Sequence, residues 1–374
     1  MKEISVNLSC ETGRSYRADR VKSLFNVTAK AGQQFSAQCH LPTDEEDWQI
    51  GLVVGPSGSG KSSIGRAVWD GRAYHSRFRW GNAPIIDEIG RDVKFDAVTG
   101  ALSAVGLGAV PTWLRPFKVI STGEKFRAEL ARLLLCGRKR IVVDEFTSVV
   151  DRRVARIGAA AFAKAWRRRS GQVILLSCHR DIIPWVHPDW MLNTEDYSFR
   201  RGCLQRRPEI KITIHRTNWR PWATFEKHHY LKLPHMIAAT NYIALHEGEP
   251  VAHLAVATTT GLKSARMCRL VVMPEWQGAG VGLRFMNWVA GQWLKGNNRY
   301  HKRMTTVFHT SHPGLAAALR RNACWLYLGG RILGQSGLSS AATLAKAHGG
   351  KHGSKYGGHM RAVQGFRYIG ENHA

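Results

Sequence analysis

The sequence predicts an α/β fold in two domains. Two stretches show the same succession of a short apolar strand, a glycine-rich loop and a helix with apolar residues at helical spacing. The first stretch begins at Ile50 and the second at Cys268. A chain of 374 residues is too long for one ordinary domain and long enough for two, each with its own core. We place the boundary in the basic, irregular stretch before Glu209 and expect domains of residues 1–207 and 208–374.

The charge balance points to a polyanionic partner. The chain has 54 Lys and Arg against 27 Asp and Glu, a formal net charge of +27 and a pI near 10.3. Residues 201–374 hold 24 of the basic and only 6 of the acidic residues, so the second half is the more basic. Such a field attracts polyanions whatever the fold, which makes nucleic acid the first partner to consider. The alternative is that the charge serves solubility alone.

The cysteines and the apolar runs indicate a cytoplasmic protein. The seven cysteines are scattered and never form a C-x-x-C pair, which favours neither a disulfide framework nor a zinc site. No apolar run approaches the roughly 20 residues that span a bilayer, and the first residues lack the apolar core of a secretory signal. We therefore expect no membrane-spanning segment. The cysteines are Cys10, Cys39, Cys136, Cys178, Cys203, Cys268 and Cys324.

A phosphate-binding loop is predicted after the buried-strand pattern Ile50–Val54, where the sequence reads GPSGSGKSS. Glycines let successive backbone N–H groups face the phosphates at a helix N-terminus. Lys61 reaches the β and γ oxygens of ATP, and Ser62 can hold Mg²⁺. A chance glycine-rich turn is the alternative, and it would not require the strand, lysine, serine and helix together. The residues expected at ATP are Gly55, Ser57, Gly58, Gly60, Lys61, Ser62 and Ser63.

A second strand pattern, from Ile141, ends in Asp144 and Glu145. These carboxylates suit an aspartate that orients Mg²⁺ with Ser62 and a glutamate that polarises water. Alone, such a pair is as often an ordinary strand end. A further strand pattern from Val173 ends near His179, and a lone histidine there would usually be structural.

Between the loop and the two carboxylates, the sequence STGEKFRAELARLLL opens a helix with Ser121, Gly123 and Glu124. Serine followed three residues later by glutamate is typical of a helix N-terminus, which binds anions.

These motifs, in this order, resemble the ATP-binding-cassette (ABC) family of P-loop ATPases over about residues 1–205. The resemblance implies that His179 is the switch histidine for the γ-phosphate, that Asp151 belongs to the D-loop, and that Ser121–Glu124 caps ATP held by another subunit. It therefore implies an ATP-dependent head-to-tail homodimer. Thr122 and Phe146 depart from the family pattern, and no clear Q-loop glutamine follows the P-loop. Because that loop couples the family to membrane helices, soluble members that work on nucleic acid or translation are the nearer comparison.

The second half contains the strand patterns Glu249–Ala257 and Cys268–Met273, then a loop from Gln277 with glycines at 278, 280 and 282. This stretch looks like motif A of the GNAT family of N-acetyltransferases, in an α+β domain with a central mixed sheet flanked by helices. The resemblance implies that the loop binds the pyrophosphate of acetyl-CoA and that the preceding strand lines the acyl group. A plain strand-to-helix turn is the alternative. The residues expected at acetyl-CoA are Val271, Val272, Met273, Gln277, Gly278, Gly280 and Gly282.

The sequence does not identify the base for acetyl transfer. Tyr327 is a candidate acid, and each candidate alone is more often structural. The tryptophans 219, 222 and 276 are more often core residues than base-stacking ones. Residues 334–359, rich in Gly, Ser and His, suggest a mobile basic loop that contacts phosphates, and their irregular spacing disfavours a metal site. The candidate bases are Glu226, His228, His229, His309 and His312.

We therefore expect an ATP-hydrolysing ABC-type ATPase coupled to an acetyl-CoA-dependent N-acetyltransferase that modifies DNA or RNA. The tRNA-cytidine acetyltransferases resemble this combination in architecture, although their ATPase is of another type. One rival hypothesis is a regulator that binds nucleic acid and has a non-catalytic second half. Another is an acetyltransferase for proteins or small amines.

Overall fold

The computed structural model describes residues 1–10, 15–25, 33–69, 71–90, 92–202, 208–231, 233–333 and 361–370. The chain forms two compact units. The first comprises Met1–Arg79 and Gly137–Pro208, and the second comprises Trp80–Cys136 and Glu209–Ala374. Residues 80–136, which the sequence assigned to the first domain, thus group with the second unit. The domain boundary at 207 and 208 stays a prediction. Among the described residues, no helix is long and apolar enough to cross a membrane.

The first unit contains a six-stranded sheet in the order β4-β5-β6-β3-β7-β8. Its strands run parallel except β8, which pairs antiparallel with β7. Each residue of β3 is buried, as the continuous apolar run of a parallel strand requires. The strands are β3 (Ile50–Val54), β4 (Tyr74–His75), β5 (Arg140–Val143), β6 (Gln172–Ser177), β7 (Trp190–Asn193) and β8 (Phe199–Arg201).

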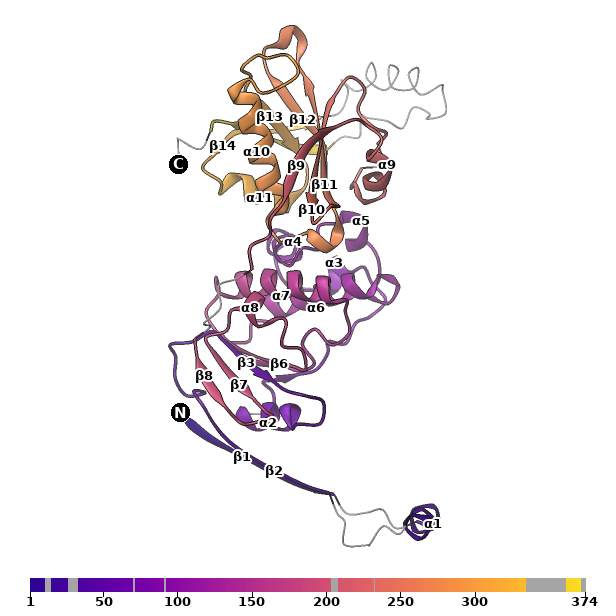
Figure 1. Cartoon of the computed structure of the whole chain (residues 1–374), viewed down its shortest axis with the longest axis vertical. Coiled ribbons are helices and arrows are strands. Elements are labelled where there is room, and N and C mark those ends of the chain that lie inside the picture. Colours follow the sequence, from indigo (N-terminus) through magenta and orange to yellow (C-terminus); the bar gives the residue numbers. More distant parts are fainter. Residues whose placement is uncertain are drawn as a thin grey trace. The chain divides into compact units, whose positions relative to one another are not determined.

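Helices and a β-ribbon cover this sheet. Strands β1 (Lys2–Cys10) and β2 (Gln33–Leu41) pair antiparallel and share a core with helix α2 (Lys61–Val68) and the sheet strands. Figure 1 shows α2 on one side of the sheet and α7 (Arg152–Trp166) on the other. The unit also contains α1 (Tyr16–Leu24), which buries no residue, and α8 (Ile183–Val186).

Residues 80–136 form a helical segment in the second unit. Its longest helix, α6, packs against α4, and α4 also packs against α11. The Glu88 carboxylate is buried and accepts hydrogen bonds from the Gly81 and Ala83 backbone N–H groups, which closes the start of the segment. The elements are α3 (Ile85–Glu88), α4 (Phe95–Ala104), α5 (Val110–Trp113), the 3₁₀ turn η1 (Phe117–Val119) and α6 (Thr122–Leu135).

The second unit is built on a seven-stranded mixed sheet in the order β14-β15-β13-β12-β11-β10-β9. Only β12 and β13 pair parallel, and the other neighbours are antiparallel. The strands are β9 (Thr213–Thr217), β10 (Thr240–His246), β11 (Glu249–Thr258), β12 (Ala265–Val272), β13 (Thr306–Thr310), β14 (Trp325–Leu333) and β15 (Arg361–Tyr368).

Helices α9 (Trp222–Phe225) and α10 (Val281–Lys295) lie on opposite faces of this sheet (Figure 1). Alternate residues of one strand show why, because Ile243 packs against the α9 cluster while Tyr242 accepts a hydrogen bond from Trp293 of α10. Helix α11 (Pro313–Arg320) packs on β13 and β14. The short turns η2 (Glu226–His228), η3 (Thr260–Leu262) and η4 (Pro274–Trp276) complete the unit. The α/β fold class and the central mixed sheet flanked by helices are confirmed.

Candidate functional site

The residues predicted to bind nucleotide in the first unit follow three neighbouring strands. The P-loop follows β3, His179 follows β6 and Asp144 follows β5, and these strands are adjacent in the order β5-β6-β3. Because the strands are parallel, their carboxyl ends meet at one edge of the sheet. The fold therefore brings together residues that are more than 80 positions apart in the sequence.

The P-loop backbone has the conformation that its glycines permit. Gly58 and Gly60 have φ angles of +81° and +84°, which residues other than glycine rarely adopt. Gly60 is also the N-cap of α2, so the helix begins at Lys61 with its N–H groups unobstructed by a capping side chain. This is the backbone shape of an anion-binding helix N-terminus.

The Lys61 ammonium lies over the loop and donates hydrogen bonds to the carbonyl oxygens of Gly55 (2.9 Å) and Pro56 (2.5 Å). Partial burial lowers its pKa, and the nearby Asp144 carboxylate acts in the opposite direction. The ammonium lies close to both the loop and the Asp144 carboxylate. The negative charge of a bound phosphate chain would further neutralise the positive charge of Lys61 there.

Ser62 and Asp144 form the oxygen pair expected for a metal ion. The Ser62 hydroxyl donates to both carboxylate oxygens of Asp144, at 3.1 and 3.0 Å, and the Tyr74 hydroxyl donates to the same carboxylate. Hydroxyl and carboxylate oxygens are ligands that Mg²⁺ prefers. The pair therefore fits the magnesium ion that accompanies ATP.

Glu145 adopts a left-handed backbone conformation, with φ of +50°, directly after Asp144. Its side chain is exposed and faces Arg77 at 3.8 Å. The next residue, Phe146, turns into the core, where it is 2% exposed and packs against Phe162. The exposed carboxylate of Glu145 thus stands beside Asp144 and outside the core.

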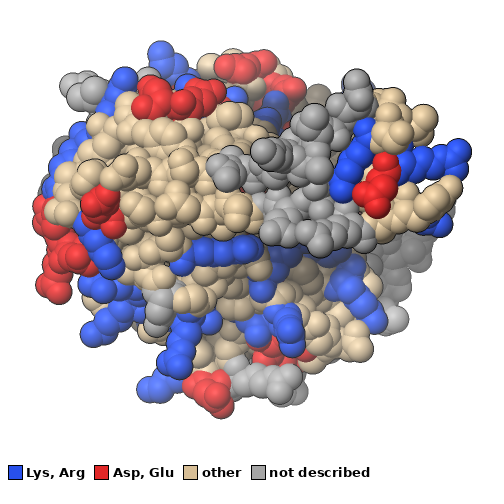
Figure 2. Space-filling view, turned by 90° about the horizontal axis from the view of Figure 1, so that it is seen from below, with Lys and Arg blue, Asp and Glu red and all other residues tan. Residues whose placement is uncertain are grey.

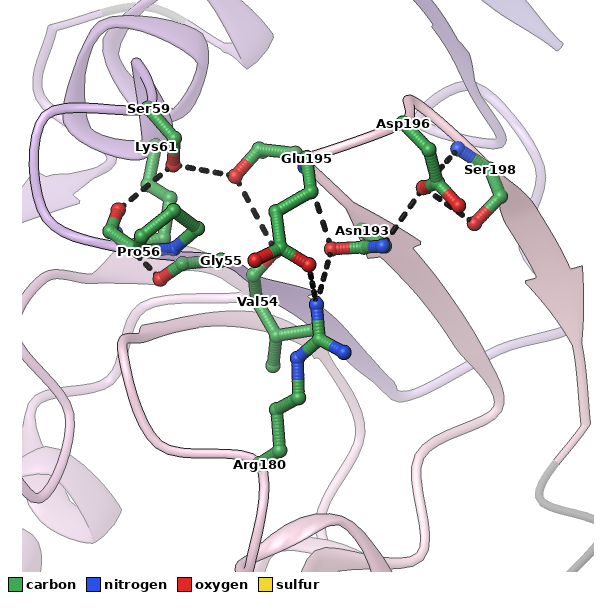
Figure 3. A network of polar contacts seen from close by, with 11 residues as sticks. Val54, Gly55, Pro56, Ser59, Lys61, Arg180, Asn193, Glu195, Asp196 and Ser198 are labelled. Carbon is green, nitrogen blue, oxygen red and sulfur yellow. Dashed lines mark hydrogen bonds and ion pairs between the residues drawn. The ribbon is translucent and has the colours of Figure 1, made fainter.

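His179 is held by its neighbours on both sides. The Ser177 hydroxyl accepts the His179 backbone N–H at 3.1 Å. Arg180 pairs with Glu195 and donates to the Asn193 side chain, so the loop after β6 is tied to the end of β7 (Figure 3). The histidine is partly exposed at this edge of the sheet.

Asp151 caps helix α7 by accepting the backbone N–H groups of Arg153 (2.9 Å) and Val154 (3.4 Å). Arg152 and Arg156 both pair with Asp181, which follows His179 in the chain. Burial alone would raise the pKa of Asp181, but the hydrogen bonds from these two guanidinium groups lower it overall. The predicted D-loop and the loop after β6 are therefore linked by ion pairs.

The predicted signature residues, Ser121–Glu124, lie in the second unit, at the start of α6. The Ser121 hydroxyl accepts the Glu124 N–H at 3.3 Å, and the Glu124 carboxylate accepts the Ser121 N–H at 2.9 Å, a reciprocal capping box. Glu124 also accepts the Thr112 hydroxyl at 2.6 Å. The Glu124 side chain is therefore occupied in capping the helix. The first N–H groups of the helix belong to Thr122 and Gly123, and N–H groups at this position suit an anion.

The predicted acyl-CoA strand separates from its parallel neighbour. Strands β12 and β13 pair only from Ala265 to Met267, opposite Thr306–Phe308, and diverge after that. On its other side β12 has a bulge in which Arg269 and Leu270 oppose one residue of β11, and Arg269 has a φ of +51°. The divergence opens the sheet beside the predicted acyl-lining segment, Val271 to Met273, although the Met273 N–H already donates to Val251 O at 2.9 Å.

The glycine loop after β12 repeats the arrangement of the P-loop. Gly278 and Gly280 have φ angles of +87° and +80° and are exposed, and Gly280 is the N-cap of α10. A β-carbon at Gly282 would lie 3.0 Å from Val272, so this glycine lets α10 pack close to β12. The start of α10 is thus a second helix N-terminus preceded by glycines.

The first half aligns with curated ATP-binding proteins. The cytochrome c biogenesis ATP-binding export protein CcmA of Rhodospirillum rubrum is 31% identical over 163 residues, which is 35% of this chain and 68% of the relative. The protein of the same name from Paramagnetospirillum magneticum is 29% identical over 172 residues, 35% of this chain and 75% of the relative. The chain belongs to the ATP-binding-cassette family.

Among solved structures, a dimeric ATP-binding cassette protein bound to ADP and phosphate matches at 11% identity and a TM-score of 0.37, over 54% of this chain and 98% of that one. A complex of an archaeal ribosomal stalk protein with an archaeal ribosome recycling factor matches at 16% identity and a TM-score of 0.32, over 39% of this chain. This chain spans about a third of that one, 35%.

Residues 209–321 match the family model described as the acetyltransferase (GNAT) family. The protein thus joins an ABC ATPase to an acetyltransferase domain, and ATP and acetyl-CoA are the substrates that these two families use. In the second unit of this ABC protein, the GNAT sheet and the signature helix occur together.

Several hydrogen bonds join the helical segment of residues 80–136 to the glycine loop of the GNAT domain. The Gln277 side chain accepts the Gly108 N–H (3.0 Å) and donates to Val272 O (3.0 Å), while its backbone carbonyl accepts Arg127 Nη1 (2.8 Å). Gln277 was predicted to contact acetyl-CoA, and the structure shows its amide engaged in holding the loop.

The candidate bases differ in their surroundings. His312 caps α11, because its Nδ1 accepts the Leu315 N–H at 3.2 Å, and its Nε2 donates to Gly108 O at 2.9 Å. Both nitrogens are therefore occupied, and burial lowers its pKa. His228 also has a lowered pKa, chiefly from burial and then from the neighbouring Lys227 charge. His229 contacts the backbone of Leu231 through Nδ1.

The other candidates lie on different elements. Glu226 and His228 are the ends of η2, and His309 lies on β13 facing Gly365 of β15. Tyr327 is on β14, 41% exposed, with the Arg320 guanidinium over its ring. His229 and His312 both lie against the Tyr230 ring, at centroid distances of 4.9 and 6.4 Å, and the identity of the base stays a prediction. Residues 334–359 lie outside the described residues.

The structure adds residues that the sequence did not reveal. Thr194, buried after β7, donates to Val54 O (3.2 Å), and its hydroxyl lies 2.5 Å from the Ser59 hydroxyl, so it links the end of β3 to the P-loop. Phe35 of β2 contacts the loop at Gly60, where a β-carbon would lie 2.0 Å from its ring. The position of Thr194 at the carboxyl end of a strand was a usable signal. Nothing in the sequence near Phe35 distinguished it from other apolar strand residues.

Proposed function

We propose that the protein couples ATP binding and hydrolysis to the transfer of an acetyl group from acetyl-CoA to an amine on DNA or RNA. We further propose that it works in the cytoplasm as an ATP-dependent head-to-tail homodimer. The observation that carries the coupling is the Arg127–Gln277 hydrogen bond, which joins the signature helix of the ATPase to the acyl-CoA loop of the transferase.

The nucleotide chemistry is supported by five residues that follow the adjacent strands β3, β5 and β6. Ser62 and Asp144 would hold Mg²⁺, which neutralises charge on the ATP phosphates when bound. Lys61 would contact the β and γ phosphates, and Glu145 would polarise the attacking water. His179, held by Ser177, would contact the γ-phosphate from the neighbouring strand end.

The transfer chemistry is supported by the divergence of β12 and β13 and by the open space around Gly280 at the start of α10. In the reaction, the amine nitrogen of the acceptor attacks the thioester carbonyl, so a C–N bond forms and the C–S bond breaks. Coenzyme A leaves as a thiolate and takes up the proton that the amine loses. Backbone N–H groups on β12 beside the bulge would stabilise the oxyanion that develops.

A basic pocket in the first unit supports a polyanionic acceptor. It has a volume of about 450 Å³, and Trp69 lies at its wall with the Arg140 guanidinium 5.8 Å from the ring centroid. No acidic side chain lines it among the described residues. Cations interleaved with an aromatic ring suit phosphates and bases. Figure 2 shows Lys and Arg side chains spread over much of the face in view. The lining residues are Trp69, Arg72, Ala73, Arg138, Lys139 and Arg140.

The deciding experiment incubates the protein with ATP, Mg²⁺ and radiolabelled acetyl-CoA in separate pools of DNA, RNA and protein. Gly280→Leu should abolish labelling, because a side chain there obstructs the start of α10. Gly248→Leu is the matched control, since Gly248 has nearly the same φ (+84°) and open space around it but lies in the β10–β11 turn. Label in DNA or RNA supports the proposal. Label only in protein identifies a protein acetyltransferase, and no label with intact ATPase activity leaves a non-catalytic regulator.

The pocket is tested by charge reversal. The double variant R138E/K139E should weaken DNA or RNA binding and reduce its salt dependence, because fewer phosphates are neutralised. The matched variant K263E/K302E reverses two exposed lysines of the second unit. If only the second variant weakens binding, the nucleic acid docks on the more basic second half, and the pocket has no part in it.

A further inference from the structure

A buried arginine connects the start of the signature helix with the acyl-CoA loop. Arg127 is 3% exposed and lies in α6, about one turn after Gly123. Its guanidinium donates to four backbone carbonyls from two separate stretches of the chain. These are Val105 O (3.0 Å), Gly106 O (3.1 Å), Gln277 O (2.8 Å) and Glu275 O (3.3 Å).

Such an arrangement is sensitive to small displacements. Burial lowers the pKa of Arg127 to about 10, with the Glu275 charge opposing that change, so the group is still a cation at pH 7. Among the described residues its hydrogen bonds go to backbone carbonyls, and a buried cation held in this way depends on each carbonyl that it contacts. Moving α6 along its axis therefore either carries the Gln277 backbone with it or leaves a charged donor unsatisfied.

The packing around the guanidinium leaves little room for slack. A β-carbon at Gly106 would lie 2.0 Å from Arg127 Nη1 and 2.2 Å from Gln277 O, and one at Gly108 would lie 2.9 Å from the Gln277 side chain. The Gly108 N–H and carbonyl are already used by Gln277 and by His312 of α11. The Val105–Gly108 stretch thus fills the space between α6 and the loop.

The loop that Arg127 contacts depends on its anchor. Gln277 is followed by Gly278 and Gly280, both with left-handed φ angles, before α10 begins. Glycine restricts the backbone dihedral angles less than other residues do, so the position of the loop depends on where Gln277 is held. A shift at Gln277 therefore changes how the first N–H groups of α10 face a bound pyrophosphate.

We propose that Arg127 is a positioning residue through which nucleotide at the N-terminus of α6 changes the affinity of the Gln277–Gly282 loop for acetyl-CoA. The inference rests on the proposed function, because it takes ATP as the ligand of the signature residues and acetyl-CoA as the ligand of the loop. Binding linkage is reciprocal, so acetyl-CoA changes the affinity for ATP by the same factor.

The test measures the dissociation constant of acetyl-CoA by calorimetry with and without saturating ATP and Mg²⁺, in Glu145→Gln protein that hydrolyses ATP slowly. We expect the constant to change about fivefold or more on adding ATP, within the usual range of coupled sites. Arg127→Met should bring this ratio close to one. Arg132→Met is the matched control, because Arg132 lies on the same helix over the Trp80 ring and should leave the ratio unchanged.

Two further variants keep the test informative if Arg127→Met does not fold. Arg127→Lys retains the charge but has no planar fork to span several carbonyls, so we expect an intermediate ratio. Gly106→Ala pushes against both Arg127 and Gln277 and should lower the ratio, whereas Gly137→Ala, at a φ of +70° with open space, should not.

The outcomes separate this inference from the proposed function. If acetyl-CoA binds and the ratio is the same in Glu145→Gln protein and in its Arg127→Met and Arg127→Lys derivatives, the positioning role of Arg127 is wrong while the proposed function stands. If acetyl-CoA does not bind to the wild-type protein at all, the proposed function fails and this inference fails with it.

Discussion

Gly60 is constrained twice, by its φ of +84° and by the Phe35 ring that a β-carbon would meet at 2.0 Å. Gly58 shares the φ angle but has open space around it. Gly60→Ala should therefore lower the free energy of unfolding by about 1–3 kcal/mol more than Gly58→Ala, the usual cost of overpacking. Phe35→Ala in the Gly60→Ala background should recover part of that difference. Urea unfolding of the four proteins measures it, and purely additive changes would show that the ring and the loop do not interact.

The Glu145 side chain is exposed beside Asp144 and faces Arg77 at 3.8 Å. Glu145→Gln should therefore reduce ATP hydrolysis by a factor of 10² or more, as the loss of a general base does, while thermal stability stays within a degree or two. Sedimentation of this variant with ATP and Mg²⁺ should show a dimer. A monomer at saturating ATP contradicts the head-to-tail assembly.

At the scale of residues, the sequence was most informative where one short motif contains all the groups. The P-loop, Asp144 and His179 could be located because each follows an apolar strand, and parallel strands place their ends together. Arg127 could not be assigned from the sequence, because an arginine between Phe126 and Leu130 gives no sign of which distant carbonyls it contacts. The acetyl-transfer base stayed open because its identity depends on contacts between elements that no motif records.

At the scale of elements, His312 makes the α11 start sensitive to pH. Burial lowers its pKa below the ordinary value of 6.5, so the unfolded state takes up a proton first as the pH falls. This group's stability contribution is therefore complete above pH 6.5 and is lost as the pH falls through its folded-state pKa, by at most about 1.4 kcal/mol per pH unit. His312→Asn retains a capping side chain and should lose less stability between pH 7.5 and 5.5.

The comparison of the two proteins in that pH range isolates His312 from His253. Burial lowers the pKa of His253 to about 4, so it destabilises both proteins equally on acidification. Identical pH dependence in the wild-type and His312→Asn proteins would show that protonation of His312 is not linked to folding.

The strands were predicted more accurately than the connections between helices. Ile50–Val54 was predicted and found as β3 because every residue of a buried parallel strand is apolar. The helices α3, α4 and α5 were not predicted individually, since four-residue helices such as Ile85–Glu88 are too short for a periodic pattern. The capping box at Ser121 and Glu124, in contrast, predicted the start of α6 correctly.

At the scale of the whole molecule, the second unit is built from two stretches of chain separated by 72 residues, Gly137–Pro208. A fragment of residues 209–374 lacks Arg127 and the partners of Gln277 and α11. We expect this fragment to unfold at a lower temperature than the second unit does in the full-length chain. We also expect the fragment to bind a dye that reports exposed apolar surface. A fragment with the same melting temperature as the second unit in the full chain would show that residues 80–136 do not support the GNAT fold.

This interrupted construction also bears on synthesis at the ribosome. Helices α4 and α6 leave the exit tunnel long before β9, and the side of α4 that meets α11 stays uncovered until about 200 more residues have been translated. At about 5–20 residues per second that interval is on the order of ten seconds or more. The second unit therefore cannot fold as one continuous stretch after the first unit is complete, because residues 80–136 belong to it and are translated earlier. The GNAT domain completes its folding when α11 packs on α4, a helix translated long before it.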